Sequence, residues 1–398
     1  MNVLFLTICK IYDLKYSDIY TDLMKQFVAN GHNVYIVAPF ERKMKRSTCL
    51  YESDGANFLG VKTLNLQKTN IVEKGLGTLL IEEQFRKAIK KYLSNTKFDL
   101  VTYSTPPITF SNVIAYIKKR DGASSFLQLK DIFPQNAVDL GYFGKHTPFY
   151  WYFRYKEKQL YRLSDVIGCM SPANIKYVTQ HNPTLSKGKI IEAPNSIEII
   201  EHKSINKIDV RKQYGLPTDK TIFLYGGNLG KPQGIDFLLN CLYQVKERTD
   251  CHFLIIGSGT ESEKIDNWLK QHHPQNVTRL GFLPKEDYYK IIRSCDVGLL
   301  FLDYNFTIPN FPSRMLPYME YKMPFIAATD LTSDAGTIAE REGFGYWCPS
   351  NDVDAFVNCI NKILSSDIAI MGQRAYNYLK EHYDVTLLYN TIMNSISK

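Results

Sequence analysis

The chain has 398 residues, 44% of them hydrophobic and 22% charged, which is enough for two or more globular domains with their own cores. Its net charge of +8 favours anionic partners such as nucleotides without singling out nucleic acid. No stretch reaches the roughly 18 apolar residues of a membrane span, residues 1–10 lack the basic lead-in of a signal peptide, and the eight cysteines form no CxxC pair. These features favour a cytosolic protein with reduced thiols and without a metal centre.

The first half of the chain alternates strand and helix patterns. Apolar runs at residues 3–8 and 33–38 flank a helical pattern at 18–30, which Gly31 ends as a C-cap. Further predicted strands lie at 100–103, 125–129, 166–170 and 189–192, and further predicted helices at 80–93 and 108–119. Such a β-α-β opening predicts a parallel sheet.

A polar stretch at residues 198–220 follows, and the alternation then restarts. The predicted strands lie at 221–225, 251–256, 277–280, 297–301 and 325–328, and the predicted helices at 235–246, 261–271, 287–294, 314–321, 354–364 and 368–382. We therefore predict an α/β protein with two Rossmann-like domains, residues 1–204 and 205–382, which face each other across a deep cleft. The amphipathic segment 383–398 is predicted to pack back on the first domain.

The most informative segment is residues 223–239, FLYGGNLGKPQGIDFLL. An apolar strand runs into Gly226, Gly227 and Gly230 before a helix begins. Glycine lets the backbone approach a ligand closely, and the N–H groups that open a helix are unpaired and partly positive. The segment therefore predicts a phosphate-binding loop. The first β-α-β unit lacks GxGxxG, which argues against a dinucleotide oxidoreductase.

Several other segments occur in a characteristic order. They are residues 30–39 (NGHNVYIVAP), 131–141 (DIFPQNAVDLG), 193–197 (APNSI), 254–259 (LIIGSG), 281–284 (GFLP) and 311–327 (FPSRMLPYMEYKMPFIA). Together with the glycine loop, they make the chain resemble the GT-B glycosyltransferases, within them the retaining enzymes of family 4, and among these the bacterial capsule and O-antigen polysaccharide subgroup. The resemblance spans nearly the full length and depends on the order and spacing of the motifs.

This resemblance implies a GT-B fold with an N-terminal acceptor-binding domain and a C-terminal nucleotide-sugar-binding domain. It implies transfer of a sugar from a nucleotide sugar, with UDP the favoured nucleotide, to a polyprenyl-diphosphate-linked or saccharide acceptor, with retention of anomeric configuration. No cofactor, no metal and no nucleic acid is expected. A nucleotide-sugar epimerase of the same architecture and a non-catalytic nucleotide-binding partner subunit remain as alternatives.

Charge that develops on a leaving diphosphate needs fixed donors, and the predicted catalytic residues are Arg314, Lys231 and Asp131. Arg314 opens a predicted helix, where the dipole disfavours a cation unless an anion binds there. For Lys231, a solvated loop lysine is an equally good interpretation. Asp131 follows a predicted strand and is expected to orient the acceptor hydroxyl or to touch the donor sugar, with an N-cap or turn aspartate as the alternative.

The residues predicted to bind the donor come from the loop, the GxG turn, the base-binding segment and the donor signature. They are Gly227, Asn228, Gly230, Gln233, Gly257, Gly281, Phe282, Leu283, Pro312, Ser313, Met315, Leu316 and Glu320. The chain departs from the family in three places, one of which is residues 7–10 (TICK), where a Gly-Gly pair often follows the first strand. Pro309 and Pro317 stand where two glutamates are usual, with Glu320 as the nearby carboxylate, and Asn228 and Gln233 replace a cationic pair. Loop capping is the alternative role for these two amides, and a solvated helix charge for Glu320.

Residues 143–163 are dense in aromatic and basic side chains. A stretch of this composition can lie in a membrane interface, where a lipid-linked acceptor would be presented, or it can pack an aromatic helix face into the first domain. We expect a peripheral contact with the inner face of the cytoplasmic membrane through the aromatic residues of 149–153, with Lys156 and Arg162 attracting anionic lipid.

Overall fold

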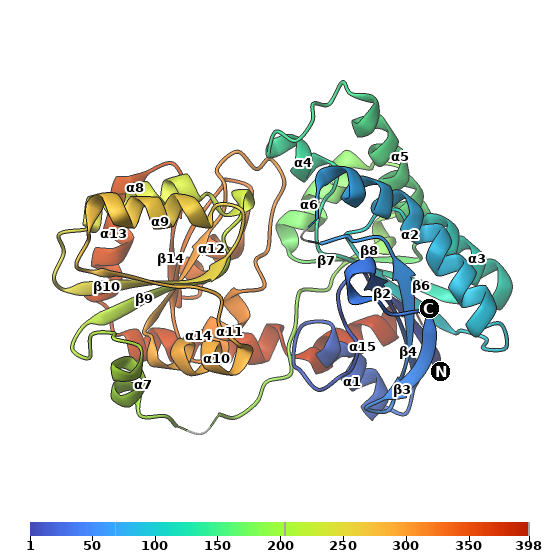
Figure 1. The fold of residues 1–398 in the computed structure, drawn as a ribbon, viewed down its shortest axis with the longest axis horizontal. Helices are drawn as coiled ribbons and strands as arrows, with labels where there is room; N and C mark the ends of the chain where they lie inside the picture. Colours follow the sequence, from blue (N-terminus) through green and yellow to red (C-terminus); the bar gives the residue numbers. More distant parts are fainter. Residues whose placement is uncertain (68, 203, 397–398) are drawn as a thin grey trace. The chain divides into compact units, whose positions relative to one another are not determined.

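The computed structural model describes residues 1–67, 69–202 and 204–396, so residues 397 and 398 of the predicted C-terminal segment lie outside the described residues. The chain divides into two compact units. Unit 1 comprises Met1–Glu198 and Asp384–Lys398, and unit 2 comprises Ile199–Tyr383. The sequence-based boundaries, after residues 204 and 382, lie close to these two breaks. Each unit contains a largely parallel sheet covered by helices (Figure 1), so the α/β class predicted from the sequence is confirmed.

Unit 1 is built on a sheet whose described strands run in the order β3-β4-β2-β1-β5-β6-β7-β8. They are β1 (Asn2–Leu6), β2 (Asn33–Glu41), β3 (Cys49–Ser53), β4 (Ala56–Thr63), β5 (Leu100–Ser104), β6 (Ser124–Leu129), β7 (Val166–Cys169) and β8 (Ile190–Glu192). The pairs along this sheet are parallel except for the edge pair β3–β4. The strand order reverses between β1 and β5, and ligands bind outside the carboxyl ends of parallel strands at such a point.

Some of the described helices of unit 1 begin at a polar side-chain cap, and others have none. They are α1 (Thr21–Ala29), α2 (Ile71–Tyr92), α3 (Ser111–Asp121), α4 (Gln135–Asp139), α5 (Pro148–Leu163), α6 (Pro172–His181) and α15 (Val385–Ile396). The side chain of Thr147 caps α5 and that of Ser171 caps α6, each by accepting a backbone N–H of the first turn. Among the described residues, no helix combines the length and the apolar character needed to cross a membrane.

The C-terminal helix α15 returns to unit 1 and packs on α1, as Figure 1 shows. Leu388 and Ile392 of α15 share a buried cluster with Leu23 and Phe27 of α1. Burial of these side chains gives the returning helix its hydrophobic stabilisation.

Unit 2 contains a sheet whose described strands are all parallel, in the order β11-β10-β9-β12-β13-β14. The strands are β9 (Thr221–Asn228), β10 (Cys251–Ser258), β11 (Val277–Leu280), β12 (Val297–Phe301), β13 (Phe325–Thr329) and β14 (Gly345–Pro349). The helices are α7 (Lys207–Gln213), α8 (Ile235–Val245), α9 (Ser262–His272), α10 (Lys285–Ser294), α11 (Met315–Glu320), α12 (Ala335–Arg341), α13 (Val353–Leu364) and α14 (Ile368–His382). The switch point of this sheet lies between β9 and β12.

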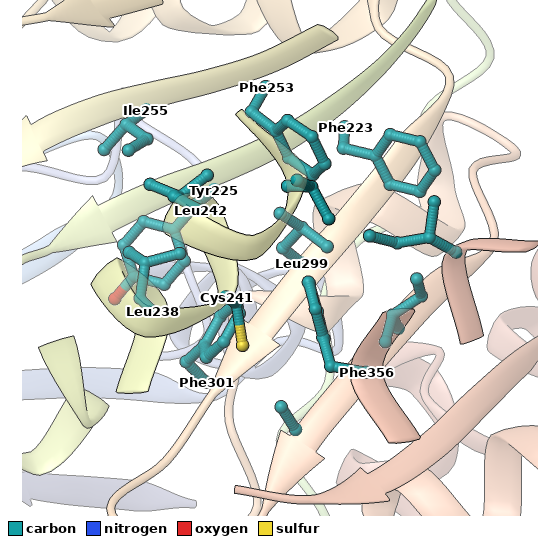
Figure 2. Packing of buried hydrophobic residues seen from close by; sticks show 14 of the residues in the cluster. Phe223, Tyr225, Leu238, Cys241, Leu242, Phe253, Ile255, Leu299, Phe301 and Phe356 are labelled. Carbon is teal, nitrogen blue, oxygen red and sulfur yellow. The ribbon is translucent and has the colours of Figure 1, made fainter. Parts of the chain in front are cut away.

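The core of unit 2 lies between its sheet and helices α8, α9 and α13, which cover one face (Figure 1). Strand residues of alternating position point into this layer and meet apolar residues of α8. Figure 2 shows part of the cluster: Phe223, Tyr225, Phe253, Ile255, Leu299 and Phe301 from the strands, Leu238, Cys241 and Leu242 from α8, and Phe356 from α13. This packing fixes the carboxyl end of β9, where the glycine loop begins.

The structure contains elements that the sequence analysis missed. The β3–β4 hairpin turns at Asp54 and Gly55, whose φ angles of 49° and 76° are left-handed, as a two-residue hairpin turn requires. Helix α7 lies inside the stretch predicted as polar linker, because Asn206 caps it and Arg211 is held by Asp296 at 2.6 Å. Helices α6 and α12 and strand β14 were also missed, and α2 begins at Ile71 rather than at residue 80.

Candidate functional site

The glycine loop follows β9 in unit 2, and close packing against β10 requires its glycines. Gly227 and Gly257 have φ angles of 125° and 141°, a region that residues with a side chain rarely adopt. A Cβ atom on Gly257 would overlap the carbonyl oxygen of Gly227, and one on Gly259 would overlap the carbonyl group of Leu229. The structure therefore gives Gly257, predicted to bind the donor, a packing role that shapes the loop.

Arg314 lies beside this loop, immediately before α11. Its guanidinium carbon is 4.9 Å from the ring centroid of Tyr225. It also lies against Gly227, because a Cβ atom added to that glycine would be 3.7 Å from the guanidinium carbon. The Nη1 atom is buried and has no hydrogen-bond partner. No carboxylate among the described residues pairs with Arg314. Arg314 as a residue is partly exposed, but burial of part of an unpaired guanidinium is costly, and an anion at this position would offset the cost.

Three tyrosines surround the guanidinium of Arg314. The Tyr318 hydroxyl accepts the Gly226 N–H at 3.2 Å, and the Tyr288 hydroxyl packs directly against Gly226. Burial raises the pKa of Tyr225, Tyr288 and Tyr318, so all three phenols are neutral at physiological pH and none can act as a counter-ion. No sequence motif predicted these tyrosines as neighbours of Arg314, although Tyr225 lies in the glycine-loop segment and Tyr318 in residues 311–327.

The polar residues of the loop bond mainly to one another. Asn228 Nδ2 donates to Gln233 Oε1 at 3.1 Å, and the Gly230 N–H donates to the same oxygen at 3.2 Å. Loop capping, the alternative role for these amides, is therefore what the structure shows, and the Gly230 N–H is already used. Lys231 lies in a single 3-10 turn, Lys231–Gln233, and lines a polar pocket of about 470 Å³.

The predicted base-binding segment and the donor signature differ in exposure. Gly281, Phe282 and Leu283 follow β11 in an open stretch where the Phe282 side chain is 78% exposed. Pro312 and Ser313 are at least partly exposed just before Arg314, whereas Met315 and Leu316 are buried. The side chains of Met315 and Leu316 therefore belong to the core, which leaves only their backbone for a ligand contact.

Glu320 lies at the far end of α11 from Arg314 and is already engaged by the protein. Its Oε1 atom is 3.1 Å from His202 Nε2 and accepts the Ile200 N–H at 3.4 Å. Its carboxylate is largely buried, so the interpretation as a solvated helix charge is wrong. A donor hydroxyl would have to compete with His202 for this carboxylate. Pro309 and Pro317, in place of the usual glutamates, offer no carboxylate.

In unit 1, Asp131 follows β6 at the carboxyl edge of the sheet. Its Oδ1 atom accepts the Asn136 Nδ2 hydrogen at 2.7 Å, and its backbone N–H and C=O both bond to the Thr105 hydroxyl, at 3.1 and 2.8 Å. Burial raises the pKa of Asp131 to about 6, against the hydrogen bonds from Asn136 and the Ile132 N–H. The next helix, α4, is capped at Pro134, so Asp131 is not an N-cap. The residue is half-buried, so its carboxyl can exchange hydrogen bonds with a substrate hydroxyl.

The described part of the chain brings no three His, Cys, Asp or Glu side chains together in a way that could hold a metal ion. The cations and carboxyl predicted as catalytic thus lie in two places: Arg314 and Lys231 around the glycine loop of unit 2, and Asp131 at the sheet edge of unit 1.

In a comparison with protein families, residues 206–382 fit the model for glycosyl transferases group 1. Among curated proteins, the chain is 22% identical over 328 residues to a probable glycosyltransferase, WbjE, of Pseudomonas aeruginosa, covering 79% of this chain and 78% of that protein. It is 24% identical over 201 residues to WcaI of Escherichia coli, a putative colanic acid biosynthesis glycosyl transferase, covering 48% and 47%.

Among solved structures, sucrose-phosphate synthase of Thermosynechococcus elongatus superposes with a TM-score of 0.78 at 16% identity, covering 99% of this chain and 98% of that one. HepE of Anabaena, solved in complex with UDP-glucose, gives a TM-score of 0.70 at 15% identity, covering 100% and 99%. These likenesses establish the fold, which is GT-B with two Rossmann-like domains. Residues 206–382 of this GT-B chain match the model of the glycosyl transferases group 1.

Proposed function

We propose that the protein is a retaining glycosyltransferase. It moves a sugar from a nucleotide sugar, with UDP as the nucleotide, to a lipid-diphosphate-linked or saccharide acceptor in the synthesis of a bacterial surface polysaccharide. Arg314 carries this proposal, because its guanidinium lies beside a glycine loop at the switch point of unit 2, with its Nη1 atom buried and without a partner. The group 1 match and the names of WbjE and WcaI support it, as does the UDP-glucose bound to HepE.

The chemistry assigns a role to each predicted catalytic residue. The bond between the anomeric carbon and the diphosphate oxygen breaks, and negative charge develops on the leaving phosphate. Arg314 stabilises this charge with its guanidinium, and Lys231 adds a second cation near the loop. The acceptor oxygen bonds to the anomeric carbon and its proton passes to the leaving phosphate oxygen on the same face. Asp131 orients the acceptor hydroxyl, and the proposal needs neither a separate base nor a metal ion.

The direct test is binding and turnover with defined nucleotide sugars. UDP, GDP and ADP sugars are compared by thermal shift, and a ligand at 100 times its Kd is expected to stabilise the fold by about 2.7 kcal/mol. Nucleotide release is then measured with and without a lipid-diphosphate acceptor, and turnover is expected only with the acceptor. An epimerase would convert the sugar without an acceptor, and a binding subunit would bind without turnover. Absence of any shift at millimolar UDP sugar would refute the proposal.

Helix α5 provides the surface for the proposed peripheral binding at the inner face of the cytoplasmic membrane. Phe149, Trp151 and Tyr155 are 67%, 62% and 57% exposed. Lys156, by contrast, has its Nζ atom 3.6 Å from Glu82 Oε2 and a side chain only 12% exposed. The expectation that Lys156 attracts anionic lipid is therefore wrong. Exposed aromatic rings beside basic residues are typical of interfacial helices. Arg162, at the end of α5, is exposed, and we propose that it attracts anionic lipid.

We expect the double substitution Phe149→Ser and Trp151→Ser to weaken binding to phosphatidylglycerol vesicles at least about tenfold, because each ring loses an apolar contact of about 1.5–3 kcal/mol on full burial. Vesicle co-sedimentation of the full chain measures the effect. Tyr243→Ser, which removes a half-exposed aromatic ring from α8 of unit 2, is the matched control. Equal binding by the double variant and wild type would remove the membrane assignment.

A further inference from the structure

Arg279 is an arginine of unit 2 to which the proposed mechanism gives no role. It lies on β11, the edge strand of the sheet, next to Ile255 of β10. Its side chain is largely buried, and its guanidinium reaches the ends of β10 and β11. Ligands of parallel α/β sheets bind at this carboxyl edge, so the position of the guanidinium bears on donor binding.

The guanidinium of Arg279 joins the ends of the two strands. Its Nη2 atom donates to the carbonyl oxygen of Gly257 at 2.8 Å, and its Nη1 atom donates to the carbonyl oxygen of Leu280. Gly257 belongs to the turn that ends β10, and Leu280 is the last residue of β11, directly before the open segment 281–283. One planar side chain with donors in a fixed fork therefore sets the spacing of both segments.

The bond to Gly257 acts at a constrained point of the glycine loop. Gly257 packs so closely on Gly227 that an added Cβ atom would overlap the Gly227 carbonyl oxygen, and Gly227 in turn lies against Arg314. Glycine has no side chain with which to hold such a position, and it has more conformational freedom to lose than other residues. Arg279 supplies the missing restraint through the carbonyl oxygen. A continuous line of contacts thus runs from Arg279 to the proposed phosphate site.

Stability alone does not account for Arg279. Arg211, which holds α7, donates to Asp296 at 2.6 Å and to the Ser294 carbonyl at 2.8 Å. Arg279 has only Asp266 as a carboxylate, 3.6 Å from an Nε atom that is buried without a hydrogen-bond partner. Burial lowers the pKa of Arg279 against the effect of Asp266, so the cation is not fully compensated. Such a cation is costly, which points to a role other than stability.

We propose that Arg279 is a positioning residue for the nucleotide sugar, because it holds the segment 281–283 and the Gly257 turn in one fixed arrangement. The assignment rests on the proposed function, with the diphosphate at Arg314. The Phe282 ring, which is 78% exposed, offers a face on which a planar base can stack. Base and diphosphate then meet one preorganised surface, which raises affinity because fewer segments have to be ordered on binding.

The test measures binding of UDP and of inorganic pyrophosphate to the full chain by calorimetry. Arg279→Met removes both bonds and keeps an unbranched stem of similar length. We expect UDP binding to weaken at least about tenfold, because the segment 281–283 is no longer held to the turn. Pyrophosphate binding should stay within about threefold of wild type, because it needs only Arg314 and a loop that keeps its own hydrogen bonds. Arg279→Lys, which retains the charge and a donor, should recover part of the UDP affinity.

Kinetics separate a positioning role of Arg279 from a role in stability. For a positioning residue, the KM for the nucleotide sugar rises in Arg279→Met while kcat stays within about threefold of wild type. Unfolding of part of the sample would instead lower the apparent kcat at an unchanged KM. The expected rise in KM also differs from the effect of Arg314→Met, where the loss lies mainly in kcat.

Two variants control for the lost packing and for the lost ion pair. Arg248→Met removes a partly buried arginine that pairs with Asp250 at 2.6 Å, just before β10. Asp266→Asn removes the carboxylate near Arg279 and keeps the two carbonyl bonds. Both variants should bind UDP within about threefold of wild type, since partly exposed ion pairs contribute little.

Three outcomes would overturn the positioning role of Arg279. They are wild-type UDP affinity in Arg279→Met, equal losses of UDP and pyrophosphate binding in that variant, and the same loss of UDP binding in Asp266→Asn. Absence of UDP binding to the wild-type protein would overturn the proposed function and this assignment with it.

Discussion

Replacement of Arg314 by methionine is expected to lower kcat/KM for sugar transfer by about 10²–10³-fold, the usual cost of removing one preorganised donor from a developing negative charge. Methionine keeps the apolar stem that packs near Tyr225 but removes the guanidinium. The loss should appear mainly in kcat, because the interaction strengthens as charge builds up on the leaving phosphate. Lysine at this position restores the charge without the planar fork, so Arg314→Lys should fall between methionine and the wild type.

The same variant separates a functional role from a structural one. Arg314 Nη1 is buried without a partner, so removal of the charge is expected to raise the melting temperature while activity falls. Arg341→Met is the control, because Arg341 is an exposed arginine of α12 in the same unit that pairs with Glu342. Initial rates of UDP release and thermal unfolding measure the two effects. Activity within about threefold of wild type would exclude Arg314 from the phosphate site.

Gly257→Ala is expected to lower the free energy of unfolding by at least about 3 kcal/mol, at the upper end of single substitutions. The φ angle of Gly257 is 141°, and a Cβ atom there would overlap the Gly227 carbonyl oxygen, which belongs to the backbone and has little room to move. Relief of the overlap must separate the ends of β9 and β10, so donor binding should be lost as well.

Gly281→Ala is the matched control for this prediction. Gly281 belongs to the same unit, yet an added Cβ atom there would meet no heavy atom within 4 Å. Its effect on unfolding should therefore stay within about 0.5 kcal/mol. Urea unfolding followed at the transition of unit 2 compares the two variants. Equal midpoints for Gly257→Ala and Gly281→Ala would show that the β9–β10 contact tolerates a side chain.

The elements that the sequence predicted well are those with a strong local signal. Strands β9, β10 and β12 are continuous apolar runs bounded by glycine or polar residues, and burial on both faces of a parallel sheet produces that pattern. The hairpin β3–β4 was missed although Asp54-Gly55 is a hairpin signal, because the first strand of the pair has no fully buried residue. Helix α7 was missed because a tertiary ion pair between Arg211 and Asp296 holds it, which local composition does not reveal.

The site divides in the same way. The sequence by itself determined that a glycine loop follows the buried strand β9 and that Arg314 stands at the start of helix α11. Both features depend only on chain order and local backbone conformation. Only the tertiary structure decided which side chains are already satisfied. It paired Asn228 with Gln233 and Glu320 with His202, while it left Arg314 Nη1 buried without a hydrogen-bond partner. Hydrogen bonding and burial depend on neighbours that are distant in sequence, and no local pattern encodes them.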